Sequence, residues 1–398
     1  MNFFSEETRR NPYPLYEQLR SHSPVMHDPT TTMWMVFDYE SVKRALTDND
    51  MFSSSLLTTA NRPTPDWLIF QDAPRHTRLR GIIMQAFTPR SVANLETRIR
   101  DLSRNLLDQM IERAHGGEID LATHYSVPLP MMVIAEMIGI PLADWPLFRN
   151  WSDVILKLSL TISDGAESQA ALREFAAMKA EVSDYLRGLV EQRRSHPRDD
   201  LLTRLVEAEV EGDGLTHEEI VAFFQLLLVG GNETTANLIN NAILCLIENP
   251  DQLARLRAEP NLLPSNIEEV LRYRAPVQWV LRATRRDVEV HDQRIPAGKI
   301  VLAMIGSANR DAKQFNDADR FDISRDPNPH VTFGHGVHFC LGAPLSRLEA
   351  RIALTDLLAR LTHFELASDQ PWEPREALHV HGPTRLPLRV QLACAAPQ

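Results

Sequence analysis

A cysteine lies in a glycine-rich segment just before a predicted helix, an arrangement that can make a thiol chemically active. The segment covers 332–344 and reads Thr-Phe-Gly-His-Gly-Val-His-Phe-Cys-Leu-Gly-Ala-Pro, with the thiol on Cys340. Backbone N–H groups and the positive dipole end at a helix start favour a thiolate, which can act as a nucleophile or a metal ligand. Glycines let the backbone turn sharply and let a flat group come close. An unpaired cysteine is more often a small buried apolar residue, so the thiol alone leaves that alternative open.

Small and hydroxylated residues interrupt the apolar pattern of a long predicted helix over 217–248, with Val-Gly-Gly-Asn-Glu-Thr-Thr at 229–235. Each glycine inside a helix costs about 1 kcal/mol relative to alanine, so a compensating role is expected. Gly230 and Thr234 are four residues apart and share one helix face. A threonine hydroxyl can bond the carbonyl four residues back, which opens a groove for water or a diatomic ligand. An ordinary helix–helix contact through small residues is the alternative.

The cysteine segment resembles the haem-ligand loop of the cytochrome P450 family, Phe-x-x-Gly-x-x-x-Cys-x-Gly, and matches it at every specified position. The resemblance implies that Cys340 gives a thiolate to the iron of haem b, and that its electron donation favours O–O cleavage. It also implies that Phe333 packs near the sulfur and that His338 donates to a haem propionate. Backbone amides of the loop, which includes Gly342, would hold the charge of the sulfur.

The interrupted helix is similar to the acid–alcohol pair of the same family, Ala/Gly-Gly-x-Asp/Glu-Thr. By this resemblance, Thr234 hydrogen-bonds the dioxygen or its water, and Glu233 passes protons in from solvent. Such a pair is expected because the reaction needs controlled proton delivery at a site that is otherwise kept dry.

Several cationic residues stand where the family binds the haem propionates. Anionic propionates need cationic partners, and arginine suits carboxylates best. The resemblance assigns His76 and Arg80 to a helix that covers the haem edge, and Arg282 to a further contact. With His338 these residues form a predicted four-point clamp, although each one singly would more commonly be a surface charge.

A carboxylate and a guanidinium, Glu269 and Arg272, stand three residues apart on a predicted helix, where they can pair. Such pairs are common on solvated faces and contribute little there. Here the pair resembles the Glu-x-x-Arg motif of the family, a buried ion pair that a further arginine locks to the irregular segment before the cysteine. The sequence offers Arg320 and Arg325 as that third member and does not decide between them.

The resemblance predicts a monooxygenase that inserts one atom of O2 into an unactivated C–H bond of an apolar molecule and reduces the other atom to water. Expected substrate contacts are predominantly apolar and suit a terpenoid, a steroid, a fatty acid or a macrocycle; they are Ile69, Val229, Gly230, Trp279 and Val380.

Two other functions fit a haem-thiolate protein. A peroxygenase would use hydrogen peroxide directly and would not need Thr234 with Glu233, so their presence favours O2 activation. A haem-based sensor or carrier without turnover would need only Cys340 and a pocket.

Electrons must come from outside this chain, because the sequence holds no flavin, nicotinamide or iron–sulfur motif. A ferredoxin with an NAD(P)H-dependent ferredoxin reductase is the expected source. Arg75, Arg78, Arg347 and Arg351 are predicted to form a basic patch on the cysteine side that binds an acidic ferredoxin.

Helical periodicity dominates the chain and predicts a mainly α protein with the triangular cytochrome P450 fold as one domain over 1–398. Predicted helices cover 14–21, 39–47, 76–87, 91–115, 130–138, 166–194, 217–248, 249–258, 264–273 and 346–361. Predicted strands cover 25–37, 282–290, 300–305 and 386–392. Residues 311–339 show neither period and predict a functional or tightly packed irregular segment.

Composition excludes several classes of protein. Lysine and arginine number 42 against 53 aspartates and glutamates, a net charge of −11, which argues against nucleic acid or an anionic membrane as a partner. Three scattered cysteines predict a reducing, cytoplasmic location without a disulfide framework. The charged start of the chain and the short apolar run at 221–231 predict a soluble protein without a membrane anchor.

Overall fold

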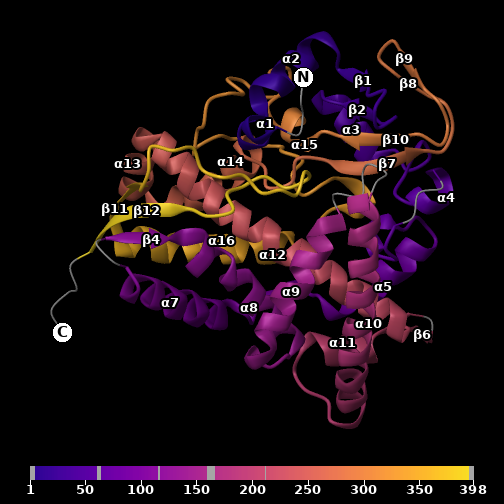
Figure 1. The fold of residues 1–398 in the computed structure, drawn as a ribbon, viewed down its shortest axis with the longest axis horizontal. Helices are drawn as coiled ribbons and strands as arrows, with labels where there is room; N and C mark the ends of the chain where they lie inside the picture. Colours follow the sequence, from indigo (N-terminus) through magenta and orange to yellow (C-terminus); the bar gives the residue numbers. More distant parts are fainter. Residues whose placement is uncertain (1–4, 61–63, 115–116, 159–165, 211, 394–398) are drawn as a thin grey trace.

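The computed structural model describes residues 5–60, 64–114, 117–158, 166–210 and 212–393. Helices make up most of the molecule, and small sheets lie at its edges (Figure 1). The cytochrome P450 fold class expected from the sequence is therefore matched by a helical body with small sheets. Cys394 and residue 115 lie outside the described residues.

Helices in this part of the chain range from single turns to a helix of 32 residues. They are α1 (Glu6–Arg10), α2 (Tyr13–His22), α3 (Tyr39–Thr47), α4 (Leu56–Ala60), α5 (Arg75–Ala86), α6 (Pro89–Ala93), α7 (Glu96–Glu112), α8 (Pro128–Ile138), α9 (Trp145–Leu156), α10 (Ala166–Ser195), α11 (Leu201–Glu207), α12 (His217–Glu248), α13 (Pro250–Ala258), α14 (Leu263–Tyr273), α15 (Ile305–Ala308) and α16 (Ala343–Arg360).

The largest sheet has the strand order β1-β2-β10-β7-β3, and its only parallel pair joins β2 to β10. A smaller antiparallel sheet has the order β11-β12-β4. Two hairpins, β5-β6 and β8-β9, complete the described strands. The strands are β1 (Val25–His27), β2 (Trp34–Val36), β3 (Phe52–Ser53), β4 (Glu118–Asp120), β5 (Glu209–Val210), β6 (Asp213–Gly214), β7 (Val280–Thr284), β8 (Val288–Val290), β9 (Gln293–Ile295), β10 (Ile300–Ala303), β11 (Leu361–Leu366) and β12 (Pro387–Leu392).

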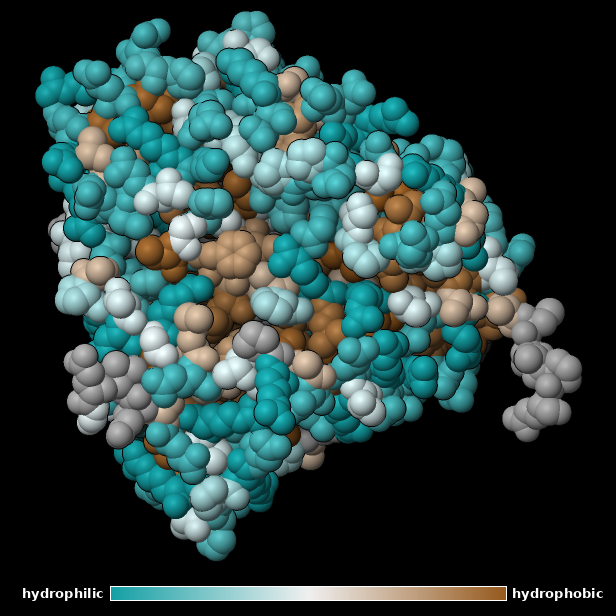
Figure 2. Space-filling model, turned by 180° about the vertical axis from the view of Figure 1, so that it is seen from behind, coloured by the Kyte–Doolittle hydropathy of each residue, from teal (hydrophilic) through white to brown (hydrophobic). Residues whose placement is uncertain are grey.

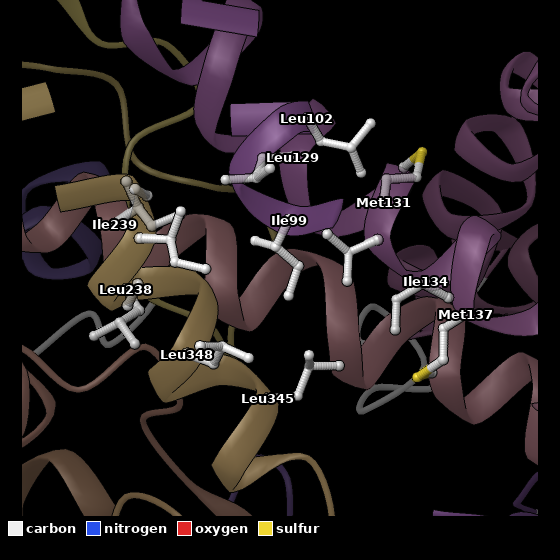
Figure 3. Packing of buried hydrophobic residues seen from close by; sticks show 14 of the residues in the cluster. Ile99, Leu102, Leu129, Met131, Ile134, Met137, Leu238, Ile239, Leu345 and Leu348 are labelled. Atoms are coloured by element: carbon white, nitrogen blue, oxygen red, sulfur yellow. The ribbon is translucent and has the colours of Figure 1, made fainter. Parts of the chain in front are cut away.

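Helix α12 passes through the middle of the helical body and packs against α8, α9, α14 and α16 (Figure 1). A capping box starts it, because the Thr216 side chain accepts from the Glu219 backbone and the Glu219 carboxylate accepts from the Thr216 N–H. Side chains of α7, α8, α12 and α16 interdigitate in the core beside it, as Figure 3 shows for Ile99, Leu102, Leu129, Met131, Ile134, Met137, Leu238, Ile239, Leu345 and Leu348. This packing holds α12 and α16, which carry the site, in fixed positions.

Most predicted long helices are confirmed within a few residues, and the differences have local causes. The predicted helix over 91–115 is two helices, α6 and α7, because α6 ends at Ala93 after its own capping box at Thr88. The predicted strand over 25–37 is the hairpin β1-β2, since the Asp28 carboxylate accepts from the backbone of Thr30 and Thr31 and forms a turn. The last predicted helix begins at Ala343 rather than at 346, which places it closer to the cysteine.

The segment between α15 and α16 is irregular, as predicted, apart from one turn of 3-10 helix at Gly336–His338. No helix of the described residues is long and apolar enough to cross a membrane.

Candidate active site

A cavity of about 710 Å³ lies between α12, the cysteine segment and the strands of the largest sheet. Apolar side chains form most of its wall, and the Cys340 side chain opens onto it. In Figure 2 apolar side chains gather in the middle of one face, within a more hydrophilic rim. Such a cavity suits a large, mainly apolar ligand.

The cysteine segment fixes the sulfur by its backbone. The Cys340 N–H donates to the Phe333 carbonyl at 2.8 Å, and Gly334 and Gly336 adopt positive φ angles that let the segment fold back on itself. The Cys340 Sγ lies 3.9 Å from where a Cβ on Gly342 would be, so a larger residue there would contact the sulfur. Phe333 is half-buried, and the Arg347 guanidinium lies over its ring.

The acidity of the free thiol differs from the sequence prediction. Burial raises the pKa of Cys340, and this effect outweighs the backbone N–H groups of Gly342 and Ala343 and the charges of Arg80 and Arg347, which lower it. The helix-start amides therefore act in the predicted direction, but burial has the larger effect on the pKa of the free thiol. A coordinated metal ion has the charge to deprotonate such a thiol outright.

Two arginines and two histidines lie close together, and three of them, Arg80, Arg282 and His338, line the cavity. The His76 and His338 rings lie 4.1 Å apart, between centroids, and the Arg80 guanidinium donates to the Phe339 carbonyl at 2.7 Å. Burial lowers the pKa of His338 to about 3, with a further decrease from Arg282, His76 and Arg80. Burial also lowers the pKa of Arg282 to about 10. The His338 ring is therefore neutral near pH 7, whereas the Arg282 guanidinium keeps its positive charge there.

The hydrogen bonds that this cluster lacks indicate which kind of ligand it can bind. Arg282 Nε and His76 Nε2 are buried and have no hydrogen-bond partner among the described residues. Asp72, the carboxylate that faces the cluster, is held instead by Arg285 at 2.7 Å and by the Ser54 N–H at 2.9 Å. Buried donors are nearly always satisfied, so the geometry fits an anionic ligand beside the cysteine.

The interrupted stretch of α12 forms another wall of the cavity. Thr234 Oγ1 donates to the Gly230 carbonyl at 2.6 Å, the backward bond expected from the sequence. Gly230 leaves the cavity open, since a Cβ there would meet nothing within 4 Å. Both residues line the cavity.

Glu233, next to Thr234, is buried behind this wall and is not a lining residue. Its Oε2 lies 3.4 Å from Arg375 Nε, an ion pair without hydrogen-bond geometry. Burial raises the pKa of Glu233, Arg375 lowers it and Asp153 raises it. A carboxyl group with a raised pKa can hold and release a proton closer to neutral pH.

The Glu269–Arg272 pair is fully buried, with Arg272 Nε 2.8 Å from Glu269 Oε2. Arg272 also donates to the carbonyls of Asn309, Ala318 and Arg320, which belong to the irregular segment before the cysteine. The third member is Arg325, whose Nε lies 3.1 Å from Glu269 Oε2, whereas Arg320 contributes its carbonyl. The network therefore ties α14 to the segment that ends at the cysteine.

The sequence of the whole chain agrees with this geometry. The family model for cytochrome P450 matches residues 7–390. The chain belongs to the cytochrome P450 family. Members of this family bind haem, iron protoporphyrin IX, through a cysteine thiolate and act as monooxygenases. The cavity sulfur and the unpaired cationic donors fit the iron and the two propionates of that group.

Known cytochromes P450 are similar over nearly their full length. Cytochrome P450 109 of Bacillus spizizenii is 40% identical over 97% of this chain and 93% of its own. The cyclomarin C epoxidase CymV of Salinispora arenicola is 37% identical over 91% of this chain and 92% of its own. The structure of CYP109Q5 from Chondromyces apiculatus has a TM-score of 0.88 at 39% identity and covers 99% of both chains. The structure of CYP109E1 from Bacillus megaterium with testosterone has a TM-score of 0.85 at 39% identity, covering 95% of this chain and 99% of the other.

The structure brings together most residues singled out in the sequence. The predicted substrate contacts all line the cavity; they are Ile69, Val229, Gly230, Trp279 and Val380. Sequence reasoning did not name many other lining residues, among them Glu349 and His379. Glu349 lies among apolar positions of α16, and His379 lies outside any regular element, so neither carried a local signal.

The four arginines of the predicted basic patch each pair with a carboxylate. Arg75 pairs with Asp66, Arg78 with Glu219, Arg347 with Glu268 and Arg351 with Glu96. The partner of Arg75 belongs to the segment before α5, and the partner of Arg78 belongs to the start of α12. Paired charges leave little net potential for an acidic partner.

Proposed function

We propose that this cytochrome P450 hydroxylates a mainly apolar small molecule of the terpenoid, steroid, fatty-acid or macrocycle type. The single observation that carries the proposal is the apolar cavity of about 710 Å³ that ends at the Cys340 sulfur. Relatives support this class, since CYP109E1 binds testosterone and CymV is a cyclomarin C epoxidase.

Haem, when bound, supplies the iron at which dioxygen is reduced and its O–O bond is cleaved. In the proposal Cys340 holds the iron from one side, and His76, Arg80, Arg282 and His338 bind the propionates. The donors that lack partners in the protein, Arg282 Nε and His76 Nε2, would then be satisfied.

Thr234 and Glu233 control protons in this proposal. The Thr234 hydroxyl already donates to the Gly230 carbonyl, so its oxygen is free to accept a hydrogen bond from a water or a protonated group in the cavity. Glu233 lies one residue away on the buried side, where its raised pKa suits a proton carrier. The apolar wall excludes bulk water, so protons enter only through such groups.

Electrons come from a ferredoxin and its NAD(P)H-dependent reductase in this proposal. Location in the cytoplasm stays a prediction from the sequence.

Reductant consumption and product formation test the function. The purified haem protein, with NADPH and a generic ferredoxin system, is screened against apolar compounds that shift its haem absorbance. Hydroxylated product that depends on NADPH and O2 is expected. Product formed only with added hydrogen peroxide would instead indicate a peroxygenase. Binding without turnover under both conditions would indicate a sensor or carrier.

A further inference from the structure

A histidine stands in the apolar wall of the cavity without a hydrogen-bond partner. His379 lines the cavity beside Val380 and Trp279, and no hydrogen bond joins its ring to any described residue. Burial alone lowers the pKa of His379 to about 4, so the ring is neutral at physiological pH. A neutral imidazole carries one N–H donor and one bare nitrogen acceptor, and both are costly to leave unpaired away from water.

The surroundings hold this ring in place. The His379 carbonyl accepts from the Gln278 N–H at 2.8 Å, and the next residue, Val380, forms a β-bridge with Val277. The ring packs against the Trp279 indole at 5.9 Å between centroids, and the indole N–H donates to the Leu378 carbonyl at 3.1 Å. The Trp279 donor is thus satisfied inside the protein, whereas the neighbouring His379 ring has no hydrogen-bond partner among the described residues.

We propose that His379 is a specificity-determining residue that hydrogen-bonds an alcohol or ketone oxygen of the substrate. The proposal rests on the proposed function and narrows it to oxygen-bearing apolar molecules. A hydroxyl can satisfy either the donor or the acceptor of the ring, whereas a ketone can only accept from its N–H. A carboxylate or an ammonium group is disfavoured, because a neutral imidazole cannot balance a buried charge.

The bond would also orient the substrate. A site built to hydrogen-bond one oxygen discriminates strongly against the analogue that lacks it, because the polar group of the protein is then left unpaired. Since the backbone around His379 is fixed, the bond anchors one point of the substrate at a constant place relative to the cysteine. The position of the hydroxylated carbon should therefore depend on His379.

Matched ligand sets test the proposal in the haem-loaded protein. The probes are dodecanol with dodecane, borneol with bornane, and androstanone with androstane, titrated by the spin-state change of the haem absorbance. We expect the oxygenated member of at least one set to bind about tenfold more tightly than its hydrocarbon, the factor that about 1.4 kcal/mol of hydrogen bonding gives. His379→Phe keeps an aromatic ring and should abolish the ratio, whereas His379→Gln keeps donor and acceptor groups and should retain most of it.

The possible results distinguish loss of the His379 hydrogen bond from loss of the fold. Equal affinities within all three sets in the unmodified protein, or a ratio that survives in His379→Phe, would overturn the role of His379. Binding of the hydrocarbons themselves tests the proposed apolar substrate class separately. The thermal unfolding temperature and the carbon monoxide absorbance band of each variant report whether the fold and the haem site are intact, so a misfolded His379→Phe is recognised and the His379→Gln comparison decides.

Discussion

Replacement of Arg272 by lysine should cost much of the stability of this protein although the charge is kept. Arg272 is fully buried and donates five hydrogen bonds, two to Glu269 and one each to the carbonyls of Asn309, Ala318 and Arg320. Lysine carries three donors on a single nitrogen and cannot reproduce the planar fork of arginine.

The contacts decide which acceptors lose their donors. Glu269 keeps Arg325, the Asp322 N–H and the Asn328 amide, and the Arg320 carbonyl keeps Arg325 at 3.2 Å. The carbonyls of Asn309 and Ala318 both accept a hydrogen bond from the same nitrogen of Arg272. A lysine whose ammonium group stays paired with Glu269 leaves both carbonyls without a donor. Two buried unsatisfied carbonyls cost about 1–3 kcal/mol each, or about 2–6 kcal/mol together. A typical protein is stable by about 5–15 kcal/mol, so the loss is large.

Urea unfolding, followed by circular dichroism, measures the loss, and the carbon monoxide spectrum shows whether the cysteine still binds haem normally. Arg294→Lys is the control, because this arginine is 71% exposed and pairs with Asp287 at the surface. A change of about 0–1 kcal/mol is expected for it. If Arg272→Lys unfolded within about 1 kcal/mol of the unmodified protein and kept its spectrum, the assignment of this network as the anchor of the cysteine segment would be refuted.

Three further predictions follow from single contacts. Thr234→Ala should keep NADPH consumption but divert it to hydrogen peroxide, measured as peroxide per NADPH; Thr234→Ser should restore product, and unchanged coupling would contradict the proton role. Glu349→Gln should stabilise the protein increasingly as pH rises, because burial holds the pKa of Glu349 well above 4.5 while the unfolded chain ionises near that value. Each pH unit between the two pKa values increases the stability difference between Glu349→Gln and the unmodified protein by about 1.4 kcal/mol. Parallel curves of unfolding free energy against pH for these two proteins would contradict the buried, protonated state of Glu349. Gly382→Ala should destabilise by about 1–3 kcal/mol in thermal unfolding, since its Cβ would overlap with the Asn237 side chain. Gly188→Ala, with nothing within 4 Å of its Cβ, is the matched control and should not destabilise.

Local patterns gave correct predictions wherever the cause lies within a few residues of chain. Helices α3 and α12 have the predicted bounds, because capping side chains and 3.6-residue periodicity are properties of adjacent residues. The cysteine segment was identified for the same reason, since its glycines and its helix start lie within a short stretch. Helices α9 and α11 were missed, since α11 is short and the periodicity of α9 was not recognised.

The sequence by itself determined the thiol, the acid–alcohol pair and the helices that carry them. The tertiary structure decided which charged and polar side chains have partners. The choice of Arg325 over Arg320, the pairing of Arg78 with Glu219 and the isolation of His379 all depend on contacts between segments distant in sequence. A charged or polar side chain acts according to the groups that surround it after folding, and those groups are not its neighbours along the chain.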